Sequence, residues 1–301
     1  MDDILTRVGV NINVSFSFVF LSLIWIRLLA MGTMIPFLFG KPVPRYILVG
    51  ASAVLAIFAY PALVPAVPPQ LPDDIFFLIM LYIKEAFYGF AIGFAVSLLF
   101  HAFESVGQMI DNQRGLSIAR ILIPQLGEQG SVTGQFLFQL ALVLYLTFGG
   151  HRVFFEGFFM SYRALPVLEF PTASAGMLSF IDLIARLSGE IFMISLTLAA
   201  PVIIAILVAD IVLGIANRVA PQINVWELGF NIKGYLGILL LFVSLSMIGD
   251  RIYYYSQMAN DAAAKTVWYL QGHAEPPAAA TVRPEDGLPK PESGTPAVIT
   301  K

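Results

Sequence analysis

The sequence predicts an all-α integral membrane protein with about six long apolar helical segments. Hydrophobic residues make up 58% of the 301 residues and charged residues 12%, whereas soluble domains carry roughly 25% charged residues. The mean hydropathy is +0.80. The apolar residues form long continuous runs, which disfavours a membrane β-barrel because barrel strands are short and alternate in polarity.

The apolar segments follow one another along the chain as loosely defined helical hairpins. We expect helices at Val14–Phe39, Tyr46–Val67, Ile75–Phe100, Val132–Phe148, Ser179–Asp210 and Tyr235–Gly249. The stretch before the first segment contains Asp2 and Asp3, and no small-residue cleavage pattern follows. The first segment is therefore expected to remain as a membrane anchor rather than to be removed as a signal peptide.

The fifth segment begins with charges of alternating sign on one helical face. Asp182, Arg186 and Glu190 are spaced four residues apart. Each such charge at the bilayer centre costs about 2.5 to 3.5 kcal/mol on insertion scales. The uncharged part, Ile191–Ala209, is long enough to span, yet the whole segment as one helix would reach about 48 Å against a hydrocarbon core of about 30 Å. We expect the charged turns to lie outside the hydrocarbon centre and to face protein or water.

The connections differ in composition. Tyr60–Asp74 contains five prolines and is expected to form a rigid hairpin connection, whereas Gly149–Gly176 is rich in aromatic residues, as is typical of surfaces that meet headgroups or another subunit. Proline and alanine dominate the C-terminal end. We expect a helical domain over residues 1–260 and a largely disordered segment over residues 261–301.

Two connections contain unusual residue patterns. Gly107–Gly134 holds five glycines around an apolar middle, and irregular backbone near a membrane must be buried in protein or line an aqueous cavity. It is either a pore-closing loop or an ordinary packed connection. Ala220–Gly237 alternates glycines with polar residues, which favours either a helix break with satisfied backbone groups or a capped turn between helices.

Isolated charges also occur within the apolar segments, at Arg27, Lys84, Glu85, Glu104 and Asp210. They could mark an ion or proton path. Intersubunit pairs or polar contacts that fix helix register are the favoured interpretation, because no relay of acidic or histidine residues repeats along a helix. The chain has three histidines and no cysteine, and it lacks zinc-protease, serine-hydrolase and phosphate-loop motifs. We predict no catalytic, cofactor or metal site.

Together, the two unusual connections resemble the T subunit of the type III secretion export gate (SctT), whose flagellar counterpart is FliR. The matching residues are Gly107, Ile110, Asp111, Gln113, Arg114 and Gly115; Gly127, Glu128 and Gln129; Ala220, Pro221, Gln222, Asn224 and Val225; and Gly229, Phe230, Ile232 and Lys233. The resemblance extends over roughly Val8–Tyr255 and is nearer to the injectisome branch than to the flagellar one. Ile123 and Asn231 depart from the family pattern, which often has Asp and Pro there.

The resemblance implies a non-enzymatic subunit of a hetero-oligomeric export gate in the bacterial inner membrane, raised in part toward the periplasm. Its partners would be sister subunits of the P/R and Q/S types, the switch/autoprotease subunit, the major export-gate subunit associated with the ATPase, membrane lipid and unfolded export substrates, with no nucleic acid. A plug loop would include Gly115, Leu116, Ile118, Ile121, Leu122, Ile123, Pro124 and Gly127. Intersubunit or buried polar contacts would involve Arg27, Glu104, Asp182, Arg186, Glu190 and Asp210.

Two other classes of function stay open on the sequence. A stand-alone transporter or channel for small solutes would place Arg27, Glu85 and Glu190 along its substrate path. An intramembrane enzyme would depend on isolated carboxylates such as Asp111 and Asp210.

Overall fold

The computed structural model describes residues 14–39, 43–64, 74–116, 131–170, 175–222 and 224–275. Every regular element within these ranges is an α-helix, which confirms the predicted fold class. The helices are α2 (Val14–Met34), α3 (Pro36–Phe39), α4 (Arg45–Leu63), α5 (Ile75–Gln113), α7 (Val132–Thr147), α8 (Gly150–Ala164), α9 (Ala175–Val219) and α10 (Val225–Leu270).

The first four predicted segments correspond to helices, with differences at their ends. The first segment is divided at Ile35 into α2 and the short α3. This division is expected, because the next residue, Pro36, cannot donate a helical hydrogen bond. The second ends at Leu63. The third continues past its predicted end at Phe100 to Gln113, so the first residues of the Gly107–Gly134 connection belong to α5 rather than to a loop.

The remaining helices extend into regions predicted as connections. The aromatic connection Gly149–Gly176 contains α8, whose polar residues hid it from a search for apolar runs. The predicted segments Ser179–Asp210 and Tyr235–Gly249 are the apolar middles of α9 and α10. The predicted domain boundary after residue 260 falls inside α10, where Ala262, Thr266 and Leu270 are buried. Residues 276–301 lie outside the described part of the chain.

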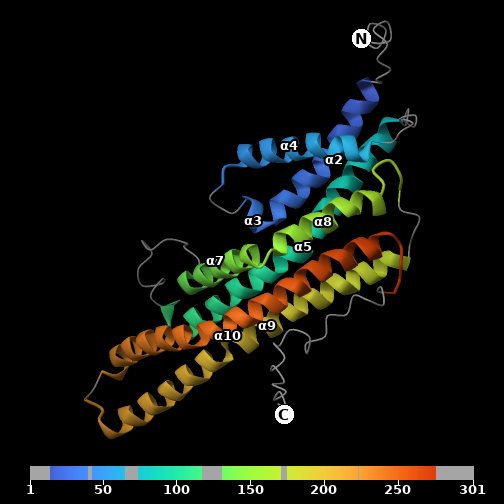
Figure 1. The fold of residues 1–301 in the computed structure, drawn as a ribbon. Coiled ribbons are helices and arrows are strands. Elements are labelled where there is room, and N and C mark those ends of the chain that lie inside the picture. Colours follow the sequence, from blue (N-terminus) through green and yellow to red (C-terminus); the bar gives the residue numbers. More distant parts are fainter. Residues whose placement is uncertain are drawn as a thin grey trace, which may run out of the picture.

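Helix α5 forms the centre of the bundle. It packs against α2, α7, α9 and α10, while α4 packs on α2 (Figure 1). Its inward residues Val96, Phe100, Phe103 and Val106 are completely buried. A single hydrophobic core therefore extends along most of α5.

Five of the described helices are long and apolar enough to cross a membrane, and α7 and α8, bent by 74°, form a sixth span if they are counted together. Helices α5, α9 and α10 contain 39, 45 and 46 residues. At 1.5 Å per residue they reach about 58, 68 and 69 Å, roughly twice the thickness of a hydrocarbon core of about 30 Å. Lipid alone cannot surround these helices along their full length.

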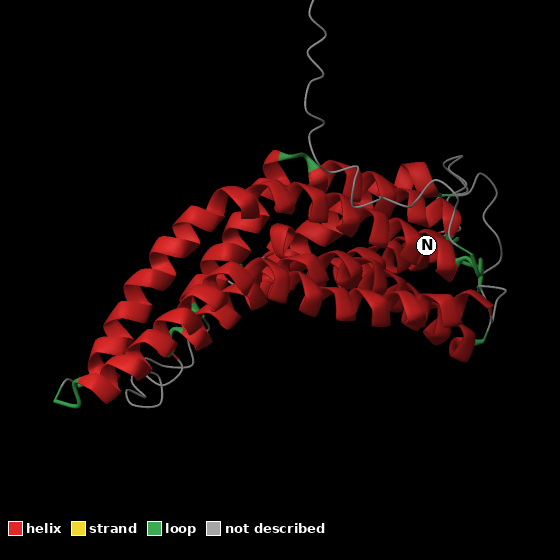
Figure 2. Cartoon of the chain, turned by 90° about the horizontal axis from the view of Figure 1, so that it is seen from below, coloured by secondary structure: helices red, strands yellow, loops and turns green. Residues whose placement is uncertain are grey.

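The hairpin of α9 and α10 projects beyond the other helices, and the molecule is curved as a whole (Figures 1 and 2). Large apolar side chains remain exposed on this projection, among them Val219 at 81% and Trp226 at 67%. This surface has no partner within the described chain.

Candidate functional site

The two unusual connections meet in space at the point where α5 ends. Asp111 lies in the last turn of α5, Arg114 follows as its C-cap, and Gly115 adopts a left-handed φ of 84° that ends the helix. On the other side of the 116–131 connection, Ser131 caps α7. Leu116 is described, whereas the predicted plug residues Ile118, Ile121, Leu122, Ile123, Pro124 and Gly127 lie outside the described residues.

The carboxylate of Asp111 joins the two ends of this connection. Its Oδ2 atom accepts hydrogen bonds from the Ser131 hydroxyl at 2.6 Å and the Thr133 amide at 3.1 Å, and its Oδ1 atom accepts from the Thr133 hydroxyl at 2.6 Å. The Nη1 atom of Arg114 donates to the same Oδ1 at 3.2 Å. Asp111 is only 1% exposed, and a buried carboxylate is stable where donors of this kind surround it.

Two further features fix the beginning of α7 against α5. The Ser131 hydroxyl also accepts a hydrogen bond from the Gly134 amide at 2.8 Å, as an N-cap should. Gly107 lies directly against the backbone of Thr133 and Gly134, so that an added Cβ atom would overlap them. The family-motif glycine at position 107 thus permits the close approach on which the Asp111 contacts depend.

Arg114 extends the cluster to α10. Its Nη2 atom donates to the Gly234 carbonyl at 3.3 Å, and its side chain occupies the space that a Cβ atom at Gly237 would need. The buried Nε atom of Arg114 has no acceptor among the described residues. We call Asp111, Arg114, Ser131, Thr133 and Gly234 the loop-base cluster. It unites residues from both predicted connections, and Gly234 lies more than 100 positions after the other four residues in the sequence.

The other motif residues order the turn between α9 and α10. Pro221 and Gln222 lie in the turn, and the Asn224 side chain caps α10 by accepting from the Glu227 amide at 3.4 Å. Gly229 lies against Leu213, and Phe230 is the side chain nearest to Gly115. Lys233 of α10 pairs with Asp210 of α9 at 3.0 Å. Of the two alternatives for Ala220–Gly237, a helix break or a capped interhelical turn, the structure therefore has the capped turn, and the helix α10 that follows it is continuous.

Arg27, Lys84 and Glu85 form a second buried polar cluster, between α2 and α5. Arg27 binds both carboxylate oxygens of Glu85, at 2.6 and 3.0 Å, and Lys84 contacts Glu85 at 3.0 Å. Arg27 also donates to the carbonyl of Leu165 and Lys84 to those of Pro166, Val167 and Glu169. The two cations thus bind the carbonyl groups that follow the C-terminal end of α8. The helix dipole is negative at that end and favours positive charge there.

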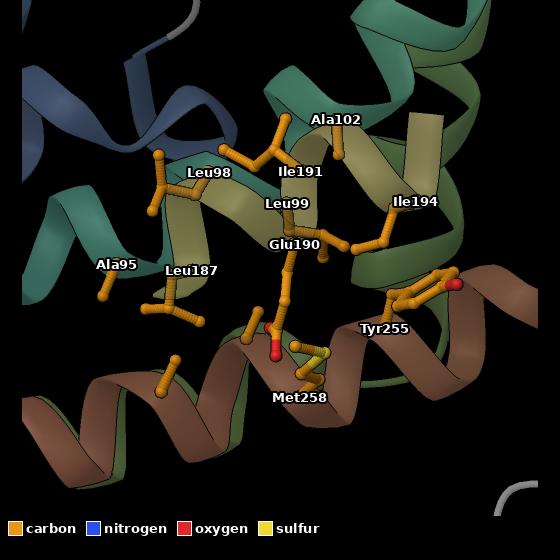
Figure 3. Close-up of a pocket in the computed structure, with 12 residues that line it drawn as sticks. Ala95, Leu98, Leu99, Ala102, Leu187, Glu190, Ile191, Ile194, Tyr255 and Met258 are labelled. Carbon is orange, nitrogen blue, oxygen red and sulfur yellow. The ribbon is translucent and has the colours of Figure 1, made fainter. Parts of the chain in front are cut away.

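The charges that begin α9 lie apart from both clusters. Arg186 pairs with Asp182 at 2.7 Å, and both side chains are more than half exposed. Glu190 lies between α9 and α10 and points toward Met258 of α10 (Figure 3). Arg27 and Glu85 pair between α2 and α5, so the described structure does not bring the three residues of the predicted transport path together. Glu104 contacts His101 at 3.2 Å.

Sequence reasoning missed Ser131 and Thr133, although a serine before an apolar run is a recognisable helix-start signal. It also missed the partners of Arg27 and Lys84, for which no local signal exists: the Ser161 hydroxyl, which accepts a hydrogen bond from Arg27 at 3.4 Å, and the carbonyl groups after α8. Among the described residues, no three histidine or acidic side chains converge to form a metal site.

Comparisons with known proteins agree with this architecture. The family described as "Bacterial export proteins, family 1" matches residues 18–258. The "Flagellar biosynthetic protein FliR" of Bacillus subtilis is 30% identical over 75% of this chain and 86% of its own length. The "Yop proteins translocation protein T" of Yersinia pestis is 35% identical over 64% of this chain and 73% of its own. The "Surface presentation of antigens protein SpaR" of Shigella flexneri is 30% identical over 58% of this chain and 65% of its own length. The chain therefore belongs to family 1 of the bacterial export proteins, the SctT/FliR family.

Proposed function

We propose that this protein is a non-enzymatic subunit of a type III secretion export gate and forms, with sister subunits, a closable channel for unfolded proteins. Its relatives are named as a flagellar biosynthetic protein and a Yop translocation protein, its family is described as bacterial export proteins, and it is a multi-pass membrane protein that takes part in protein export. The proposal extends this role to a pore across the bacterial inner membrane, in an injectisome rather than a flagellum.

The observation that carries the channel proposal is the loop-base cluster. Asp111 holds both ends of an apolar 116–131 connection at one point, and Arg114 ties that point to α10. A connection with a fixed base and an apolar middle can occupy a pore without pulling on the helices that carry it. We assign Leu116 to Gln129 as the segment that narrows the closed channel and moves aside during export.

The exposed apolar surface supports an assembly. The projecting α9–α10 hairpin exposes large side chains, and the longest helices exceed the bilayer about twofold. Sister subunits of the P/R and Q/S types would cover this surface, with part of the complex raised toward the periplasm. The switch/autoprotease subunit and the major export-gate subunit are the further partners that we propose.

Deletion of Leu116 to Gln129 tests the plug. In cells that also produce the sister subunits, we expect the deletion to increase leakage of small solutes across the inner membrane, measured as dye or ion flux. A matched control removes the same length of chain, residues 288–301, and should leave leakage unchanged.

Two results of this experiment would contradict the proposal. Unchanged leakage in the loop deletion would reject the plug assignment. Solute flux through the chain produced without sister subunits would favour a stand-alone channel instead of a gate subunit.

A further inference from the structure

Arg114 is the side chain through which the loop-base cluster reaches α10. This side chain is 10% exposed. Its Nη1 atom lies 3.2 Å from Asp111 Oδ1 and 3.4 Å from the Thr133 hydroxyl, whereas Nη2 lies 3.3 Å from the Gly234 carbonyl. The Nε atom has no acceptor among the described residues. One guanidinium group therefore contacts α5, α7 and α10 together.

The contacts within the cluster differ in strength. Between α5 and α7, the Asp111 carboxylate accepts three hydrogen bonds, two of them at 2.6 Å, and bonds to a charged acceptor are the stronger kind. To the neutral carbonyl of α10, Arg114 donates one bond at 3.3 Å. If the bond to α10 breaks, the guanidinium keeps its pairing with Asp111; if the bonds of Asp111 break, buried donors lose their acceptor. The cluster therefore separates most readily between Arg114 and α10.

The surface of α10 does not interlock with Arg114 at this contact. The Cγ, Cδ and Nε atoms of Arg114 occupy the place where a Cβ atom of Gly237 would lie, so the side chain rests directly on the helix. At Gly234, which supplies the acceptor, nothing lies within 4 Å of the Cβ position. Because α10 presents no side chain at either glycine, it can move away from Arg114 without a change of rotamers.

The projecting α9–α10 hairpin is held together at the same level. Lys233, the neighbour of Gly234, pairs with Asp210 of α9 at 3.0 Å. Gly229 of α10 lies against the Leu213 side chain of α9. The two helices of the projection are therefore expected to move as one body.

The hairpin is fixed to α5 at another level, nearer to the middle of the bundle. There the buried Ser195 hydroxyl of α9 donates to the Ala102 carbonyl of α5 at 3.0 Å. Ala102 and Arg114 are about 18 Å apart along α5 at 1.5 Å per residue. Beyond Arg114 the hairpin projects past the other helices (Figure 1). A small tilt of the hairpin about the Ser195 contact would thus break the Arg114 contact first.

We propose that Arg114 is a positioning residue that latches the α9–α10 hairpin to the loop-base cluster, and that this contact separates when the channel opens. The Asp111 contacts stay intact, so that the end of α5 and the beginning of α7 remain one unit. A partner subunit that displaces the hairpin then acts on the loop base through Arg114. The latch has a role only in a closable channel, and in this respect it rests on the proposed function.

Two neighbouring glycines of α10 provide a matched test. Gly237→Ala places a methyl group where the Arg114 side chain lies and displaces it, whereas Gly234→Ala adds the same group in open space and keeps the carbonyl acceptor. In cells that produce the sister subunits, we expect Gly237→Ala to raise solute leakage several-fold, to a level below that of the Leu116 to Gln129 deletion. Gly234→Ala should leave leakage as it is in the unaltered chain.

Thermal unfolding in detergent separates a latch from a general loss of structure. Both alanine variants should keep the unfolding temperature of the unaltered chain, because the flexible Arg114 side chain can shift without moving the backbone. Equal leakage of the two variants would overturn the proposal. So would leakage of Gly237→Ala that is accompanied by a lower unfolding temperature.

A reversible covalent link tests whether the contact must open. The chain contains no cysteine. The Cγ atom of Arg114 lies 2.8 Å from the Cβ position of Gly237, so the two Cβ atoms, one C–C bond farther, are at most about 4.3 Å apart, which suits a disulfide. In Arg114→Cys/Gly237→Cys, we expect mild oxidation to form an intramolecular disulfide and to stop secretion, and a reductant to restore it. The two single-cysteine variants are the controls, and oxidation should leave their secretion unchanged.

The outcomes of this experiment separate the latch from the gate assignment. Secretion through the oxidised double variant would overturn the latch, and so would the absence of a disulfide, because the contact would then not exist. If deletion of Leu116 to Gln129 leaves leakage unchanged while the disulfide stops secretion, the plug assignment is wrong and the latch stands. If the deletion causes leakage while the disulfide has no effect, the plug stands and the latch is wrong.

Discussion

Asp111 is the residue on which the geometry of the loop-base cluster depends. It accepts four hydrogen bonds from Ser131, Thr133 and Arg114, and these three residues come from both ends of the connection. A buried donor that loses its acceptor remains desolvated without compensation. The contribution of Asp111 is therefore best measured by removing the carboxylate while the donors stay.

We predict that Asp111→Ala lowers the unfolding free energy of the full chain by about 3 kcal/mol or more, because it leaves buried polar groups and the Arg114 charge unpaired. Thermal unfolding in detergent should show the decrease. Asp182→Ala is the matched control: its ion pair is exposed and lies within one helix, so we expect a change of about 0.5 kcal/mol or less. Equal effects of the two substitutions would show that Asp111 has no special structural role.

At this scale, the sequence indicated the importance of Asp111 and Arg114 through a motif, but it did not identify their partners. Arg114 contacts Gly234 of α10 and Asp111 contacts Thr133 of α7. Such contacts arise from helix packing, and no periodicity along the chain specifies them. The same holds for Lys84, whose acceptors are the carbonyl groups after α8.

At the scale of the elements, apolar runs predicted that helices exist but not where they end. Helices α9 and α10 continue well beyond their apolar middles because polar turns are also helical when neighbouring helices or water satisfy their side chains. Helix α8 escaped prediction because the polar residues Arg152, Glu156 and Arg163 interrupt its apolar residues, so that it contains no long apolar run, although Phe154 and Phe158 are buried. Hydropathy measures composition, and helix ends depend on caps such as Asn224 and Gly115.

The crossing of α5 and α7 gives a prediction at this scale. We expect Gly107→Ala to destabilise the full chain by about 1 to 3 kcal/mol, because the added methyl group overlaps the backbone of Gly134 and the helices must separate. Gly157→Ala in α8 is the control, since nothing lies within 4 Å of its Cβ position; there we expect a gain of up to about 1 kcal/mol. Thermal unfolding of both variants in one detergent makes the comparison, and a Gly107→Ala protein as stable as the unaltered chain would contradict the packing argument.

At the scale of the whole molecule, the long helices and the projecting hairpin expose both apolar and charged side chains. A bilayer can cover only part of the apolar surface, because the helices are longer than the hydrocarbon core is thick. Helix α9 carries the exposed Asp182–Arg186 pair near one end and exposed Val208, Val212 and Val219 toward the other. One helix therefore presents a polar surface near one end and an apolar surface near the other, at different heights along its axis. Subunits that contact both levels would hold the chain at one height relative to the membrane.

We predict that Arg186→Glu leaves the stability of the isolated chain nearly unchanged but prevents its assembly with the sister subunits, and with it secretion. The intrachain pair with Asp182 is exposed and contributes about 0.3 to 0.5 kcal/mol, whereas a like charge placed in a protein interface opposes binding by several kcal/mol. Co-purification of the subunits from membranes and a secretion assay measure the outcome. The exchange Asp182→Arg/Arg186→Glu separates the two roles, because it restores the intrachain pair but leaves position 186 reversed. If assembly depends on the position of the Arg186 charge, the exchange variant fails as the single variant does; if Arg186→Glu assembles and secretes normally, the charged face of α9 has no role in the complex.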